Sequence, residues 1–84
     1  MSKKEKLAQR FLSRPVDFTF DELITLLGSM GYFMETAGKT SGSRVVFYNE
    51  NGDYIRLHKP HPRNILKTYQ INDIISNLKE KGLL

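Results

Sequence analysis

The chain lacks cysteine, has only three prolines among its 84 residues, and contains no long apolar run. Without cysteine it can form neither a disulfide nor a thiolate zinc site, and it has no cysteine nucleophile. No segment approaches the length needed to cross a bilayer, and the first residues lack the apolar run of a signal peptide. We therefore expect a cytoplasmic protein with no membrane partner.

Histidine is scarce as well, because the chain has only His58 and His61. An unperturbed imidazole titrates near neutrality, which makes these two side chains the natural candidates for moving a proton at pH 7. Both lie in residues 56–67, together with two prolines and four cations. The nearby carboxylates Glu50 and Asp53 are typical of a turn, so the sequence predicts neither a metal site nor a cofactor.

The positive charge is concentrated in the middle of the chain. Thirteen Lys and Arg against nine Asp and Glu give a formal net charge of +4. Between residues 39 and 67 the cations are Lys39, Arg44, Arg56, Lys59, Arg63 and Lys67, and the acids are Glu50 and Asp53. Such an excess suits a polyanion, nucleic acid first, although a small basic domain can also be merely soluble.

Apolar residues at helical spacing predict three helices. The first covers residues 4–13, and the second follows a capping box formed by Thr19 and Glu22 and ends at Gly31 in a left-handed conformation. The last begins near Thr68 and ends at Gly82. In each helix one apolar stripe is expected to face the core.

Three strands are predicted at residues 32–37, 44–48 and 54–58. A three-residue loop with Gly52 in the left-handed position pairs Arg44 with His58 and Tyr48 with Tyr54. This register separates the two faces. The core face then has Val45, Phe47, Ile55 and Leu57, and the opposite face has Arg44, Val46, Tyr48, Tyr54, Arg56 and His58.

The element order is helix, helix, strand, strand, strand, helix. We predict an α+β fold in which helices cover one face of a three-stranded antiparallel sheet and leave the other face open. Residues 1–84 are expected to form one domain, with 1–18 as an N-terminal helical extension. Residues 19–84 have the α-β-β-β-α order of a double-stranded-RNA-binding domain, an analogy that carries no function by itself.

The open face is a plausible site for RNA phosphate. Arg44 opposite His58 favours function, because two cationic groups facing each other repel unless something offsets them. For metal-independent RNA cleavage, His58 is the candidate base, Arg44, Lys39 or Lys59 would stabilise charge, and His61 or a nearby lysine would be the acid. A histidine between two prolines can also simply shape a turn. The expected RNA-binding residues are Lys39, Ser43, Arg56, Lys59, Arg63 and Lys67. Tyr48 and Tyr54 are interpreted as an ordinary cross-strand pair.

The order of motifs resembles the HicA toxins of bacterial toxin–antitoxin systems. The resemblance is carried by residues 42–47, residues 55–62, Leu66-Lys67 and a terminal helix closing with Gly82, and it covers about Thr19 to the end. It implies a double-stranded-RNA-binding-like fold, an endoribonuclease activity on mRNA that blocks translation, and a HicB-type antitoxin that covers the active face.

This chain departs from the family pattern at one position. In the best-known members the residue after Gly-Ser is the catalytic histidine, whereas here it is Arg44. Arginine cannot act as a base at neutral pH. We therefore expect His58 to take over that role. The alternatives are a non-catalytic RNA-binding module on the same basic face and a pure protein-interaction domain.

Overall fold

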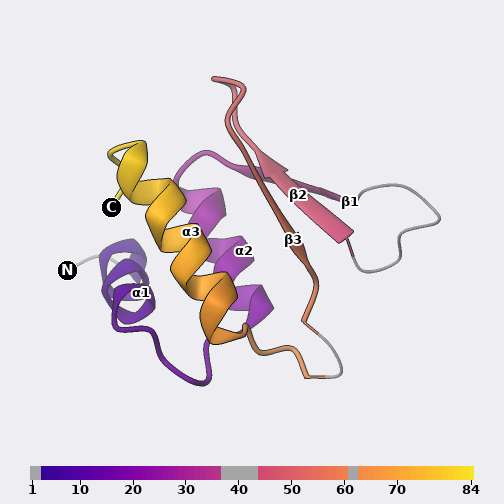
Figure 1. The fold of residues 1–84 in the computed structure, drawn as a ribbon. Helices are drawn as coiled ribbons and strands as arrows, with labels where there is room; N and C mark the ends of the chain where they lie inside the picture. The colour runs from indigo at the N-terminus through magenta and orange to yellow at the C-terminus, as the bar shows by residue number, and fades with distance from the viewer. Residues whose placement is uncertain (1–2, 37–43, 61–62) are drawn as a thin grey trace.

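The computed structural model describes residues 3–36, 44–60 and 63–84. They form α1 (Lys3–Leu12), α2 (Phe20–Ser29), β1 (Phe33–Thr36), β2 (Arg44–Tyr48), β3 (Tyr54–His58) and α3 (Thr68–Glu80). The three strands make one antiparallel sheet in the order β1-β2-β3. All helices lie on one side of this sheet, and its other face is open (Figure 1). The predicted α+β, double-stranded-RNA-binding-like fold is confirmed.

The start of α2 has the capping box that the sequence predicted. The Glu22 backbone N–H donates to Thr19 Oγ1 at 3.1 Å, and the Thr19 N–H donates back to Glu22 Oε1 at 3.0 Å. Each bond pairs a backbone donor that the first helical turn leaves without a partner. The capping box therefore determines where α2 begins.

Glycine ends both α2 and α3. Gly31 has φ +91° and donates to the Gly28 carbonyl, while the next N–H, of Tyr32, reaches back to Leu27. Gly82 has φ +74° and ends α3 in the same way: its N–H donates to the Lys79 carbonyl, and the Leu83 N–H donates to the Leu78 carbonyl. A side chain with a Cβ is strained at such φ values, so glycine at these positions makes the chain turn sharply out of the helix.

The hairpin adopts the register predicted from its turn. Gly52 has φ +86° and donates to the Asn49 carbonyl, and the Asn49 N–H donates to the Asp53 carbonyl. Pairing then runs from Tyr48 with Tyr54 at the turn to Arg44 with His58 at the far end. This three-residue loop keeps the apolar residues of both strands on one face.

The core lies between the covered face of the sheet and the helices. Its fully buried members come from all three helices, β2 and the segment before α2, and they are Phe11, Phe18, Leu23, Leu26, Leu27, Phe47, Ile71, Ile75 and Leu78. Val45 and Ile55 are buried beside them, and Leu57 is partly buried against the same cluster. The predicted division of the hairpin into two faces is therefore confirmed.

Tyr32 is a buried phenol at the junction of α2 and β1. Its side chain is 3% exposed, and its hydroxyl has no hydrogen-bond partner among the described residues. Burial, and in second place the Asp53 carboxylate, raises the pKa of Tyr32. Tyr32 therefore acts as a core residue, and it does not lie on the open face.

Among the described residues, no helix is both long enough and apolar enough to span a membrane.

Candidate functional site

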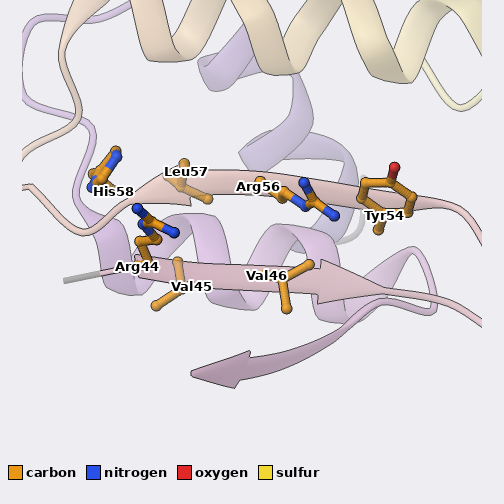
Figure 2. A pocket seen from close by; sticks show the side chains of 7 residues that line it. All are labelled: Arg44, Val45, Val46, Tyr54, Arg56, Leu57 and His58. Atoms are coloured by element: carbon orange, nitrogen blue, oxygen red, sulfur yellow. The ribbon is translucent and has the colours of Figure 1, made fainter. Parts of the chain in front are cut away.

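Arg44 and His58 meet at one end of the open face. Arg44 is the first residue of β2, His58 is the last residue of β3, and the antiparallel register pairs them directly. Both side chains are exposed. Figure 2 shows the two side chains together at the same end of the hairpin.

The hydrogen-bond pattern of the hairpin brings this pair especially close. The Asn49 N–H donates to the Asp53 carbonyl, so the pair at the turn is a hydrogen-bonded one. Hydrogen-bonded and non-hydrogen-bonded residue pairs alternate along an antiparallel ladder. Arg44 and His58 are five pairs away from Asn49 and Asp53, so they form a non-hydrogen-bonded pair. In such pairs the Cα atoms are about 4.5 Å apart and the side chains are closest.

A shallow pocket of about 700 Å³ extends from this pair along the hairpin. Seven residues line it, and they are Arg44, Val45, Val46, Tyr54, Arg56, Leu57 and His58 (Figure 2). Halfway along, the guanidinium carbon of Arg56 lies 4.8 Å from the centroid of the Tyr54 ring. The pocket is therefore cationic at the Arg44 end and aromatic toward the turn.

The cations of this face have no carboxylate partner within the part of the chain that the structure describes. By contrast, Arg10 on the helical side forms salt bridges with Asp17 at 2.7 Å and Glu22 at 3.1 Å. Arg44 and Arg56 are exposed on the face without such neutralisation. An uncompensated guanidinium can bind two oxygens of a phosphate at once, so the face is chemically suited to a phosphate group.

Three other predicted RNA-binding cations lie elsewhere. The Lys59 Nζ is 5.9 Å from the Phe20 ring centroid, at the start of α2 on the helical side. Arg63 and Lys67 are exposed in the segment between β3 and α3, where Leu66 pairs with the chain just before α2. The structure thus joins Arg44, Arg56 and His58 on one face and separates Lys59, Arg63 and Lys67 from them.

The remaining predicted site residues, Lys39, Ser43 and His61, lie outside the described residues.

Gln70 is a residue of the site that sequence reasoning missed. It lies in the first turn of α3, is only 6% exposed, and donates from Nε2 to the His58 backbone carbonyl at 2.9 Å. Its Oε1 accepts from the Lys67 N–H at 3.0 Å. One buried amide therefore connects the end of β3 to the start of α3. Glutamine at the third position of a helix was the available signal, since it is one of the two residues typical of a capping box.

No cluster of three or more histidine or carboxylate side chains capable of holding a metal occurs in residues 3–36, 44–60 and 63–84.

Fold and site together define a small α+β domain with a double-stranded-RNA-binding-like arrangement and an open, cationic sheet face. A model of the HicA toxin family of bacterial toxin–antitoxin systems matches residues 20–83, which is more than half of the chain. The chain belongs to the HicA toxin family. Membership implies a toxin–antitoxin function of the ribonuclease type. No curated protein and no solved structure matches the chain.

Proposed function

We propose that this protein is an mRNA-cleaving toxin that works without a metal ion and uses His58 as the general base. The observation that carries the proposal is the direct pairing of His58 with Arg44 on an exposed face, where neither side chain has a salt bridge among the described residues. Family membership supports the reaction class, and this pairing supports the choice of residues.

The reaction needs a base, a charge stabiliser and an acid. Neutral His58 removes the proton of an RNA 2′-hydroxyl, and the 2′-oxygen forms a bond to the adjacent phosphorus. The bond from phosphorus to the 5′-oxygen then breaks, and that oxygen takes a proton from the acid, for which we propose His61. The products are a 2′,3′-cyclic phosphate and a free 5′-hydroxyl.

Arg44 stabilises the transition state in this scheme. Negative charge builds up on the phosphoryl oxygens as the 2′-oxygen attacks, and a guanidinium in place before the reaction lowers the barrier by binding those oxygens. Arg44 cannot be the base because it stays protonated at neutral pH. The pairing of Arg44 with His58 supplies a different base, because the His58 imidazole emerges from the neighbouring strand beside the position where the family has its catalytic histidine.

The test is incubation of the purified chain with RNA in the presence of a chelator. Products with 2′,3′-cyclic ends are expected from the unaltered chain, and His58→Ala should lower the cleavage rate by about 10²- to 10⁴-fold, the usual contribution of general acid–base catalysis. Because His58 is exposed, the free energy of unfolding should change by less than about 0.5 kcal/mol. Lys79→Gln, in the last turn of α3, is the matched surface control.

Two results would change this conclusion. Undiminished cleavage by His58→Ala together with loss of cleavage in His61→Ala would move the role of base to His61. RNA that is bound but stays intact at high protein concentration would instead favour a non-catalytic RNA-binding module, a reading supported by Arg44 at the position of the usual histidine.

We further propose that the 84 residues work as one cytoplasmic domain neutralised by a HicB-type antitoxin. Residues 1–18 contribute Phe11 and Phe18 to the common core, with ring centroids 4.8 Å apart, which supports their role as an integral extension of the family domain. The antitoxin would cover the open face, where binding blocks access of RNA to Arg44 and His58. Pull-down of the chain by the product of the adjacent reading frame tests this pairing.

A further inference from the structure

Three aromatic side chains form a row across the open face, at the end opposite Arg44 and His58. Phe33 pairs with Tyr48 across β1 and β2, and Tyr48 pairs with Tyr54 across β2 and β3. Directly paired residues point to the same face of a sheet, so all three rings emerge on the open side. We call Phe33, Tyr48 and Tyr54 the aromatic row.

The aromatic row is more exposed than a structural role requires. Phe33 is 54% exposed, Tyr48 41% and Tyr54 53%. The Phe33 and Tyr48 rings are 5.9 Å apart, centroid to centroid, and tilted by 43°. A phenylalanine with half of its surface in water gains little from burial, so these rings offer flat apolar faces to a ligand.

The charges around the row indicate what kind of ligand fits. Arg56 lies between the row and the Arg44–His58 pair, with its guanidinium over Tyr54. The chain beyond the row turns acidic, at Glu50 and Asp53. An anionic polymer would therefore be attracted at the cationic end and repelled beyond the row, which matches a ligand with its phosphate at Arg44 and an apolar ring on the row.

The distance between the two ends suits a short length of RNA. Tyr48 lies four residue steps beyond Arg44 along β2, which corresponds to roughly 13 Å at about 3.3 Å per residue. Glu35 is exposed in the middle of β1, at the edge of the face, and it would repel a phosphate there. The favourable path for the backbone therefore follows β2 and β3, over Arg56 and away from β1.

We propose that the aromatic row stacks an unpaired base of single-stranded RNA while Arg44 holds a phosphate of the same strand beside His58. In a duplex both faces of a base are covered by its neighbours, so the row can stack only on a base that is unpaired. The face therefore selects single-stranded over double-stranded RNA. This inference rests on the proposed ribonuclease function and adds the substrate class to it.

The experiment measures binding without cleavage. The probe is a fluorescent single-stranded RNA with 2′-O-methyl groups, which removes the hydroxyl that the proposed reaction needs. Fluorescence polarisation compares this probe with its duplex and with versions that carry one abasic position. The protein variants are Phe33→Leu/Tyr54→Leu, which keeps apolar bulk without a ring, and Phe33→Tyr/Tyr54→Phe, which keeps both rings.

Loss of base stacking should weaken binding of the single strand by about five- to 150-fold, the range found for one stacked base. The leucine variant should show this loss, and the ring-retaining variant should bind more tightly than the leucine variant by a similar factor. With the unaltered chain, a probe that carries one abasic position should bind more weakly by the same factor. Val16→Ala, at an exposed apolar residue between α1 and α2, is the control for general surface effects.

Several outcomes would overturn the proposal. Equal affinity for intact and abasic strands, or for single strand and duplex, would exclude base stacking by the aromatic row. If the chain still cleaved ordinary RNA, the proposed ribonuclease function would stand without it. Leucine variants that keep RNA affinity but escape neutralisation by the antitoxin would make the row a protein-binding surface instead. A chain that neither binds nor cleaves RNA would remove both proposals.

Discussion

Arginine occurs in two opposite environments on the two sides of this molecule. On the helical side Arg10 contacts Asp17, both oxygens of the Glu22 carboxylate and the face of Phe18, at 5.2 Å from the ring centroid. On the open face of the sheet, Arg44 stands beside His58 with no carboxylate partner among the described residues. The residue type is the same, but its surroundings differ.

The difference separates structural charge from charge that is available to a ligand. Glu22 also closes the capping box of α2, so Arg10 joins α1 to the start of α2 through a group that the fold already needs. The side chains of Arg44 and His58 have no hydrogen bond or salt bridge in the described structure, and they repel each other whenever both are charged. Arg10 is therefore explained by the fold, whereas Arg44 and His58 suit the anionic partner that we propose.

The largest effect on stability is expected where the two sides are joined, at Gln70. Gln70→Met keeps the bulk of the side chain but leaves the His58 carbonyl and the Lys67 N–H without their partner. We expect a loss of about 1–3 kcal/mol in the free energy of unfolding, the usual cost of an unpaired buried polar group. Urea denaturation measures it, with Lys79→Gln as the control. An unchanged midpoint would mean that the amide does not hold β3 to α3.

On the helical side, Arg10→Met should lower the free energy of unfolding by about 1–2 kcal/mol. The figure is modest because the Arg10 side chain is 35% exposed and water screens its ion pairs. RNA affinity should stay unchanged, since Arg10 is remote from the open face. Denaturation and RNA titration of the same sample test both statements. A variant with weakened RNA binding and full stability would contradict the division of roles.

On the open face, Arg44→Gln should have the reverse pattern. Loss of one phosphate contact should lower RNA affinity several-fold and reduce the slope of log affinity against log salt by about 0.7 for a single strand. Stability should change by less than about 0.5 kcal/mol, because the side chain is exposed and unpaired. Titrations at several salt concentrations measure the slope. An unaltered slope would show that Arg44 does not contact phosphate.

The last expected effect, at Tyr32, depends on pH. Burial raises the pKa of Tyr32 in the folded chain above its ordinary value of 10.0, so the unfolded chain loses the phenolic proton first as the pH rises. The resulting stability is fully present below pH 10 and is lost as the pH rises through the folded pKa. Tyr32→Phe should remove this alkaline loss and change the stability at pH 7 by less than about 1 kcal/mol. Denaturation at neutral and alkaline pH compares the two chains, and an identical alkaline decline would argue against burial as the cause.

Sequence reasoning succeeded wherever the evidence was local. Thr19 and Glu22 form the predicted capping box, and Gly31 and Gly82 end their helices in the left-handed conformation. The hairpin register followed from Gly52 and from the need to keep apolar residues on one face, and it correctly paired Arg44 with His58. Each of these features depends on residues close together in the chain, so its physical cause can be read there.

Sequence reasoning was incomplete wherever distant segments meet. The hairpin register correctly placed Arg56 on the face of Arg44. The positions of Lys59, Arg63 and Lys67 did not follow from it, because the chain after β3 turns to the start of α2. Phe33 could not be joined to Tyr48 and Tyr54 before the register of β1 was known. The amide bond from Gln70 to His58 likewise links residues that only the packing of α3 on β3 brings together.

The amino-acid sequence by itself determined the elements, the hairpin register and the neighbourhood of Arg44 and His58, because capping, turn geometry and the alternation of a strand act over a few residues. Only the tertiary structure decided which cations share one face, which rings line up across three strands, and which buried amide holds the end of β3. These arrangements depend on contacts between segments far apart in the chain, and such contacts are determined by how the helices pack on the sheet.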